Sequence, residues 1–219
     1  MHVDESQVKS KAGRRWMPVV GIAFVVVAAN IWVWQSVIKD RVIPKRFGVV
    51  EQGRIYRSGQ LSAALVKKIF VEHNIRVVVD LTTEDPNNPD QQAEKLAAAE
   101  LDIKIIKLPL RGDGTGDINN YARAITAISE ADRKATPVLV HCAAGAQRAG
   151  GVIAAYRLLV QKKDPGFAIS ELKHYGWDQK DDQALLTYLN SNMADLAQLL
   201  KQSGVIDEVP KPLPQLPQN

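Results

Sequence analysis

The spacing of apolar residues along the chain alternates between the pattern of buried strands and the pattern of helices. Three short apolar runs, rich in β-branched residues, indicate strands buried on both faces: Ile75–Leu81, Ile103–Leu108 and Pro137–His141. Apolar residues that alternate on either side of Gln52-Gly53 predict a short hairpin over Val49–Arg57. Helical spacing is found in further segments, at about 62–73, 91–101, 117–131, 148–161, 165–175 and 178–201.

This order of elements predicts the fold class. Strands that alternate with helices indicate an α/β domain, with a central, mainly parallel sheet flanked by helices. We place the domain at residues 47–203, after a linker at 39–46. Ser62 and Asp117 are expected to cap the helices that they begin. Residues 204–219 hold four prolines in 16 positions, which predicts a disordered tail.

A long uncharged segment precedes this domain. Residues 17–38 contain no charge in 22 positions, about the length that a helix needs to cross a hydrocarbon core. The segment follows a basic stretch, residues 1–16, and we predict that it is an uncleaved transmembrane signal anchor. Two alternatives remain open: a cleaved signal peptide with Val27–Ala29 as its small-residue site, and a buried core helix.

Most of the net charge of the chain flanks this apolar segment. The net charge is +4 over 219 residues, and residues 1–41 account for +3 of it. The globular part is therefore close to neutral, and we expect no nucleic-acid partner. A short basic start before the first apolar segment favours a cytoplasmic amino terminus. We therefore expect a single-pass protein of the inner (cell) membrane with a periplasmic, extracytoplasmic domain, and keep a cytoplasmic domain as the alternative.

The only cysteine of the chain lies between the third predicted apolar strand and the helix that follows it. The sequence at this junction is His-Cys-Ala-Ala-Gly-Ala-Gln-Arg-Ala-Gly, residues 141–150. Backbone N–H groups converge at such a junction, and the helix dipole presents its positive end there. Gly145 lets the chain curl with its amides inward, and Arg148 can close over an anion with its planar guanidinium. The arrangement suits a tetrahedral phosphate, and its field favours the nucleophilic thiolate of Cys142.

The motif His-Cys-x-x-Gly-x-x-Arg resembles the signature of the cysteine-dependent protein tyrosine and dual-specificity phosphatases. The resemblance covers about residues 47–200, and residues 47–60 are similar to the opening of the compact, atypical branch found in bacteria, fungi and plants. It implies a tyrosine-phosphatase-like fold and a phosphocysteine mechanism without a metal or other cofactor. In that mechanism Cys142 is the nucleophile, Arg148 stabilises the transition state, and His141 is expected to orient the loop. The residues expected to hold the phosphate are Ala143, Ala144, Gly145, Ala146, Gln147 and Arg148.

Enzymes of this family also use an aspartic acid from a separate loop, which protonates the leaving oxygen and then activates water. The glycine-rich segment Arg111–Asp117 offers two candidates. Asp113 lies in the middle of the loop and is the preferred acid. Asp117 is the alternative acid, although a role as the cap of the following helix explains it better.

One position departs from the family pattern. The residue after Arg148 is usually Ser or Thr, whose hydroxyl helps the thiolate to leave, and here it is Ala149. The second chemical step is therefore expected to be slow unless another group compensates. We predict a membrane-anchored phosphomonoester phosphatase of the tyrosine and dual-specificity type, whose substrate is a phosphorylated protein bearing phosphotyrosine or a phosphorylated lipid. The alternatives are a catalytically weak phosphate-binding module, a phosphatase of a phosphorylated lipid or glycolipid, and a thiol-redox or sulfur-transfer protein.

Overall fold

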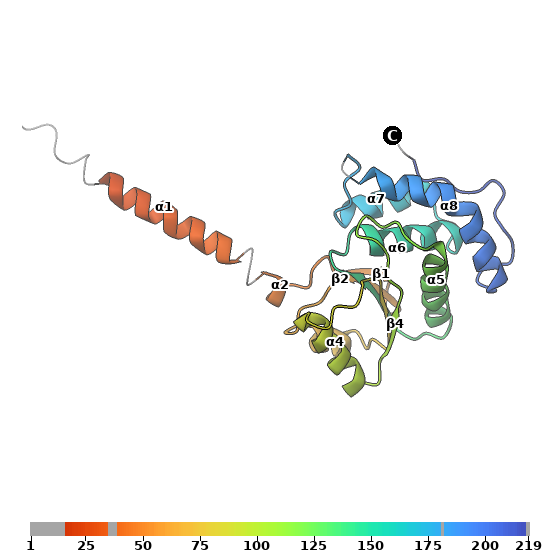
Figure 1. Cartoon of the computed structure of the whole chain (residues 1–219), viewed down its shortest axis with the longest axis horizontal. Helices are drawn as coiled ribbons and strands as arrows, with labels where there is room; N and C mark the ends of the chain where they lie inside the picture. Colours follow the sequence, from red (N-terminus) through yellow and green to blue (C-terminus); the bar gives the residue numbers. More distant parts are fainter. Residues whose placement is uncertain (1–15, 35–38, 181, 218–219) are drawn as a thin grey trace, which may run out of the picture. The chain divides into compact units, whose positions relative to one another are not determined.

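The computed structural model describes residues 16–34, 39–180 and 182–217 (Figure 1). The chain divides into two compact units, Met1–Val42 and Ile43–Asn219. The second unit contains the predicted strands and the loop that follows Cys142. The candidate site therefore lies within a single compact unit.

Within the described residues, a five-stranded sheet forms the centre of this unit. Its strands are β1 Gly48–Glu51, β2 Ile55–Gly59, β3 Val77–Asp80, β4 Lys104–Lys107 and β5 Val138–Cys142. They lie in the order β1-β2-β5-β3-β4, with β1 antiparallel to β2 and the other neighbours parallel. The sheet is mixed but mainly parallel, which confirms the predicted α/β class. Because β5 lies between β2 and β3, the cysteine at its end is enclosed by a strand on each side.

Helices cover both faces of the sheet (Figure 1). They are α3 Val66–Glu72, α4 Pro89–Glu100, α5 Ile118–Arg133, α6 Gln147–Leu159, α7 Pro165–His174 and α8 Gln183–Gln202. A smaller hydrophobic cluster packs α3 and α4 on the face of the sheet that carries Leu139. A larger cluster packs the helices α5, α6, α7 and α8 on the opposite face, which carries Val138 and Val140. Side chains of a strand alternate between its two faces, so β5 contributes to both clusters.

Side chains cap the amino termini of three of these helices, α4, α5 and α7. Asn88 accepts hydrogen bonds from two backbone N–H groups of the first turn of α4. Asp117 accepts one from the Asn119 N–H at 2.9 Å, so the predicted cap of α5 is confirmed. The predicted cap at Ser62 is wrong. Residues 62–65 form a turn, α3 begins only at Val66, and the carbonyl of Ser62 rather than its hydroxyl accepts the Val66 N–H.

The carboxyl-terminal tail lies against the domain, which contradicts the predicted disorder of this segment. Leu216 is 1% exposed, its N–H donates to Asn190 Oδ1 at 2.8 Å, and its carbonyl accepts from Asn190 Nδ2 at 2.8 Å. Val209 and Leu213 pack against the larger cluster. Proline removes backbone donors and prevents regular structure, but the apolar residues between the prolines can still be buried.

The first unit contains α1 Trp16–Val33 and the short α2 Lys39–Val42. α1 coincides with most of the apolar segment 17–38, whereas residues 35–38 and most of the basic stretch 1–16 lie outside the described residues. Among the residues that the structure describes, no helix combines the length and the apolar character that a membrane span requires. The structure therefore does not support the predicted transmembrane helix.

Candidate active site

The carboxyl ends of β2, β3 and β5 meet at one edge of the sheet, around Cys142. Cys142 is in register with Gly59 of β2, and its neighbour His141 is in register with Asp80 of β3. Parallel α/β sheets bind ligands at this edge, outside the carboxyl ends of their strands. The loop Cys142–Arg148, which connects β5 to α6, is called the phosphate loop below.

The phosphate loop curls over the thiol. The Gly145 N–H donates to Cys142 Sγ at 3.1 Å, and Cys142 is 1% exposed. Gly145 has a φ of 78°, and a Cβ added there would lie 2.5 Å from the backbone nitrogen of Gly59. Only glycine fits this position, as the sequence pattern predicted. An inward N–H and the amino terminus of α6 both stabilise negative charge on the sulfur.

Two polar side chains of the phosphate loop lie at the start of α6. Gln147 Nε2 donates to Asp182 Oδ1 at 2.7 Å, which ties the loop to the turn that precedes α8. Arg148 Nη1 makes a long hydrogen bond of 3.4 Å to the carbonyl of Leu81. Arg148 Nε is buried and has no hydrogen-bond partner among the described residues. The guanidinium therefore keeps donor capacity with which it can bind an anion.

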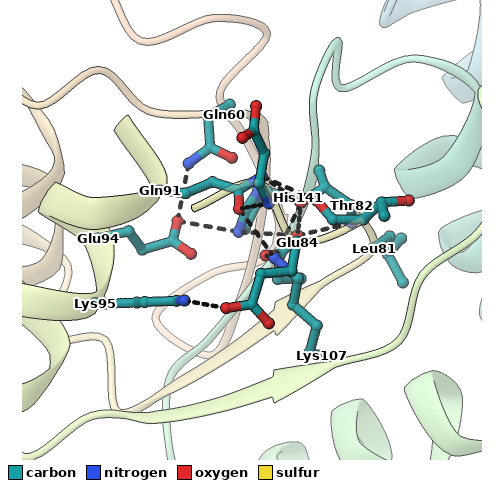
Figure 2. A network of polar contacts seen from close by, with 12 residues as sticks. Gln60, Leu81, Thr82, Glu84, Gln91, Glu94, Lys95, Lys107 and His141 are labelled. Carbon is teal, nitrogen blue, oxygen red and sulfur yellow. Dashed lines mark hydrogen bonds and ion pairs between the residues drawn. The ribbon is translucent and has the colours of Figure 1, made fainter. Parts of the chain in front are cut away.

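His141 is fully buried behind the nucleophile, against two carboxylates. Its Nε2 lies 3.1 Å from Glu94 Oε2 and 3.8 Å from Asp80 Oδ1 (Figure 2). Burial opposes the charged imidazolium, but the two carboxylates outweigh this effect and raise the pKa of His141 to about 9. At neutral pH a positive charge therefore stands next to Cys142. Neither carboxylate was among the predicted site residues, because only the register of β3 and the packing of α4 bring them here.

A second cation, the partly exposed Lys107, lies at the edge of the same cluster. Its Nζ donates to Asp80 Oδ2 at 2.6 Å, and the hydroxyl of Thr82 donates to Asp80 Oδ1 at 2.7 Å (Figure 2). Burial would raise the pKa of Asp80, but His141, Lys107 and Thr82 hold it below its usual range. Asp80, Glu94 and His141 place possible metal-ligand atoms within 4.8 Å of one another. Because Lys107 already supplies positive charge at Asp80, we interpret the cluster as an ion-pair network that fixes His141.

The loop between β4 and α5 brings the preferred acid towards the phosphate loop. A Cβ added at Gly114 would lie 3.3 Å from the carbonyl oxygen of Gln147, so the loop tip touches the start of α6. Asp113 is exposed, and its Oδ1 accepts hydrogen bonds from the Thr115 N–H at 2.9 Å and from the Thr115 hydroxyl at 2.8 Å. The N–H bond, followed by the hydroxyl bond, lowers the pKa of Asp113. Asp113 is thus next to Gly114, which contacts the start of α6, while the Asp113 carboxylate accepts its hydrogen bonds from Thr115 in the same turn.

The alternative acid, Asp117, is engaged as a helix cap. Its Oδ1 accepts from the Asn119 N–H and from Asn119 Nδ2, both at 2.9 Å. The bond from the backbone N–H, and then that from the side chain, lower the pKa of Asp117. The structure therefore accounts for this carboxylate without a role in catalysis.

A buried arginine that was not among the predicted site residues lies against the phosphate loop. Arg57 of β2 is 1% exposed, and its Nη2 donates to the carbonyl of Gly145 at 2.8 Å. Its guanidinium also stacks over the ring of Tyr175, 4.0 Å from the ring centroid. Burial lowers the pKa of Arg57 to about 10, which leaves it charged at neutral pH. Nothing in the sequence marks β2 as an inner strand of the sheet, so the burial of Arg57 could not be predicted.

The chain matches a known protein family and several curated proteins in sequence. Residues 26–187 match the family described as DSP-PTPase phosphatase fused to NAD+ kinase. The chain is 42% identical over 71 residues to the dual specificity protein phosphatase OPG106 of Vaccinia virus (strain Western Reserve), a match that covers 32% of this chain and 42% of that protein. It is 27% identical over 131 residues to the dual specificity protein phosphatase TpbA of Pseudomonas aeruginosa, covering 58% of this chain and 54% of that protein. The matches thus span about half the length of these curated relatives.

Solved structures show the same fold. The crystal structure of P. aeruginosa TpbA aligns with a TM-score of 0.58 at 25% identity, over 73% of this chain and 91% of that one. The core catalytic domain of a PP-IP phosphatase from S. cerevisiae aligns with a TM-score of 0.56 at 18% identity, over 78% and 97% of the two chains, and shares the fold. With a family match over more than half of its length, the chain belongs to the DSP-PTPase family of cysteine-dependent dual-specificity phosphatases.

Proposed function

We propose that this chain is a phosphomonoester phosphatase of the tyrosine and dual-specificity type that acts through a phosphocysteine intermediate. The observation that carries the proposal is the Gly145 N–H at 3.1 Å from the buried Cys142 Sγ, in the loop that begins α6. The sulfur lies at the floor of a loop that offers backbone N–H groups to a tetrahedral phosphate. Arg148 adds a cation with unused donor capacity to the same loop.

In the first chemical step, the Cys142 thiolate attacks the phosphorus of the substrate. A sulfur–phosphorus bond forms while the bond between phosphorus and the leaving oxygen breaks. The loop N–H groups and Arg148 bind the remaining phosphate oxygens, and Asp113 transfers its proton to the leaving oxygen. Asp113 exchanges its hydrogen bonds with Thr115 for this role, and the negative charge of the bound phosphate favours the protonated carboxyl group.

In the second step, water attacks the phosphorus of the phosphocysteine. The Asp113 carboxylate takes a proton from the water, the sulfur–phosphorus bond breaks, and inorganic phosphate and the Cys142 thiolate are released. The imidazolium of His141 stabilises the departing thiolate from behind. Ala149 is fully buried and offers no hydroxyl to assist this step.

The depth of the nucleophile favours phosphotyrosine as the substrate group. Cys142 is 1% exposed, so the phosphate must be delivered to the floor of the loop. A phenyl ring carries its phosphate farther from the peptide backbone than the short side chain of phosphoserine does. A crystal structure of a TpbA variant contains phosphotyrosine, which supports this choice of substrate class for a chain with the same fold.

Hydrolysis of an aryl phosphate by the full chain, purified in detergent, tests the proposal. The wild type is expected to show hydrolysis that orthovanadate inhibits, and Cys142→Ser is expected to abolish it. Equal rates in the two proteins would refute Cys142 as the nucleophile. Comparison of a phosphotyrosine peptide, a phosphoserine peptide and phosphoinositide vesicles then tests the substrate class. Preferential hydrolysis of the vesicles would replace the protein substrate with a lipid.

A second candidate function, a phosphate-binding module with slow turnover, is favoured by Ala149. If dephosphorylation of Cys142 is slow, rapid-quench measurements will show a burst of leaving group close to one per protein molecule, followed by slow release of phosphate. Ala149→Ser supplies the missing hydroxyl and is expected to raise the steady rate. A wild type without a burst, with a steady rate equal to that of Ala149→Ser, contradicts slow hydrolysis. Tight phosphate binding without any leaving-group release would favour the binding module.

We also propose that residues 17–38 anchor the chain in the inner membrane, with the domain outside the cytoplasm. This proposal rests on the sequence, which has 22 consecutive uncharged positions after a basic start. The full chain is expected in the membrane fraction after an alkaline wash, and protease added to intact spheroplasts is expected to digest the domain. Recovery in the soluble fraction would refute the anchor, and protection from protease would indicate the cytoplasmic orientation.

A further inference from the structure

Three consecutive carbonyl groups of the phosphate loop are bound by donors from the segment 46–60. The pairs are Ala143 with the Gln60 N–H at 3.2 Å, Ala144 with Arg46 Nη1 at 2.8 Å, and Gly145 with Arg57 Nη2 at 2.8 Å. All of these donors precede the loop by more than 80 positions in the chain and lie on or next to β2. The segment 46–60 therefore holds the loop that the signature motif forms.

The geometry of the peptide unit gives these bonds a consequence inside the loop. In a trans peptide the carbonyl oxygen and the N–H point in opposite directions. In the peptide unit between Ala144 and Gly145, both polar groups are hydrogen-bonded: the carbonyl accepts from Arg46, and the N–H donates to Cys142 Sγ. A donor that holds a loop carbonyl on one side therefore directs the next N–H towards the thiol and the anion.

Arg57 holds its carbonyl from within the domain. Its guanidinium is buried between the Gly145 carbonyl and the ring of Tyr175. A Cβ added at Gly150 would lie 3.5 Å from Arg57 Nη2, so the first turn of α6 also packs closely against it. A buried cation needs such partners because water is excluded from its charge.

Arg46 reaches its carbonyl from the linker, in a backbone conformation that non-glycine residues rarely adopt. Its φ is 45°, and a Cβ at Gly176 would lie 2.7 Å from Arg46 Nε. The adjacent Lys45 carbonyl accepts the Gly59 N–H at 2.7 Å, which fixes the linker at the end of β2. A residue in a strained backbone conformation persists only where its surroundings hold it. The Arg46 side chain lies against Gly176, in a space that any larger residue at position 176 would fill.

We propose that Arg46 and Arg57 are positioning residues of the phosphate loop, which hold the carbonyls of Ala144 and Gly145 so that the following N–H groups face the bound phosphate. The inference rests on the proposed function, since it assigns these N–H groups to the phosphate of the substrate. We assign both arginines a role that acts through the loop, with no contact of their own with the substrate. Their contribution is to keep the loop in the anion-binding conformation before the substrate arrives.

The exposed residue, Arg46, offers the cleaner test. In the full chain, Arg46→Ala removes one charge-assisted hydrogen bond to the loop and is expected to weaken binding of orthovanadate, measured by calorimetry, by roughly tenfold. Arg46→Lys keeps a cationic donor and is expected to recover part of this loss. Arg54→Ala is the matched control, because Arg54 is an exposed arginine of the turn between β1 and β2 that pairs with Asp132 at 2.8 Å and not with the loop.

Two glycine variants distinguish the effect of filling the space beside Arg46 from the effect of general backbone strain. Gly176→Ala places a methyl group against Arg46 Nε and is expected to weaken orthovanadate binding as Arg46→Ala does. Gly53→Ala also introduces a side chain at a positive φ, 73°, but into open space, and is expected to leave binding unchanged. Thermal unfolding of each variant reports any loss of stability separately from the loss of affinity.

The outcomes distinguish this inference from the proposed function. The inference is supported if Arg46→Ala and Gly176→Ala bind orthovanadate more weakly than the wild type while Arg54→Ala and Gly53→Ala bind it as the wild type does. This holds even if the wild type hydrolyses no phosphate ester. Affinities within about twofold of the wild type in both test variants overturn it, even if the wild type is an active phosphatase. Arg57→Lys, at a buried position, is interpreted only where its unfolding transition remains cooperative, and it is then expected to weaken binding as well.

Discussion

At the scale of single residues, the site depends on charges that are buried together. His141 and Lys107 are cations, Asp80 and Glu94 are carboxylates, and ion pairs join the four into one network in which Lys107 alone is partly exposed. Buried charges are stable only when they are paired, and removing one partner leaves the other uncompensated. The network therefore fixes the protonation of His141 as well as its position.

Stability should depend on pH through His141. The pKa of His141 is about 9 in the folded protein, above its ordinary value of 6.5. The imidazolium then contributes stability that is fully present below about pH 6.5 and is lost as the pH rises through about 9. Glu94→Gln removes the carboxylate that contributes most to this shift, so it is expected to destabilise the protein at about pH 6 and to flatten the decline between about pH 6.5 and 9. Urea unfolding across this range measures both effects.

Glu84→Gln is the control for that experiment. Glu84 is an exposed carboxylate at the edge of the same network, paired with Lys95, so its loss should leave the pH dependence of the wild type in place (Figure 2). If Glu94→Gln retains the wild-type slope, His141 is not held as an imidazolium by Glu94.

The two aspartates of the β4–α5 loop should respond differently to substitution. Asp113→Asn removes the proposed proton donor and is expected to lower kcat about 10²–10⁴-fold with little effect on unfolding. Asp117→Ala removes the cap of α5 and is expected to cost about 1 kcal/mol of unfolding free energy with kcat close to that of the wild type. Steady-state kinetics and urea unfolding on both variants check this. A large loss of kcat in Asp117→Ala alone would reverse the assignment of the acid.

At the scale of elements, the sequence predicts where strands lie along the chain more directly than it predicts which elements pack beside them. β3 and β4 fall within the predicted apolar runs, and β5 covers its run from Val138 and continues one residue further, to Cys142. The continuous apolar run reflects burial on both faces in β3 and β5, whereas β4 is only partly buried. The junction of β5 and α6 and the start of α5 were also predictable, since Gly145 at the first and the cap Asp117 at the second act over a few residues. These local rules sufficed to find Cys142 and Arg148.

The surroundings of the phosphate loop could not be predicted in the same way. Glu94 reaches His141 only because α4 packs on the face of the sheet beneath β3 and β5, and Arg57 is buried only because β2 is an inner strand. Both facts depend on pairings between segments far apart in the chain, which no local pattern encodes. The residues that hold the motif are therefore visible only in the folded chain.

At the scale of the whole molecule, the domain is closed by a segment without regular structure. The tail between Val205 and Leu216 follows α8 and places apolar side chains on the larger cluster. Asn190 of α8 binds both backbone groups of Leu216, which satisfies a buried residue that lies outside any helix or strand. The tail is thus part of the core of the domain.

Removing the side chain of Leu216 should therefore destabilise the whole domain. Leu216 is 1% exposed, and truncation of a buried leucine leaves a cavity, so Leu216→Ala is expected to lower the unfolding free energy by about 2 kcal/mol. Leu96→Ala is the matched control, because Leu96 is 72% exposed on α4 and should change stability by less than about 0.5 kcal/mol. Urea unfolding of the two variants measures the difference. Equal stabilities would mean that the tail does not pack in solution, and the larger core would then end with α8.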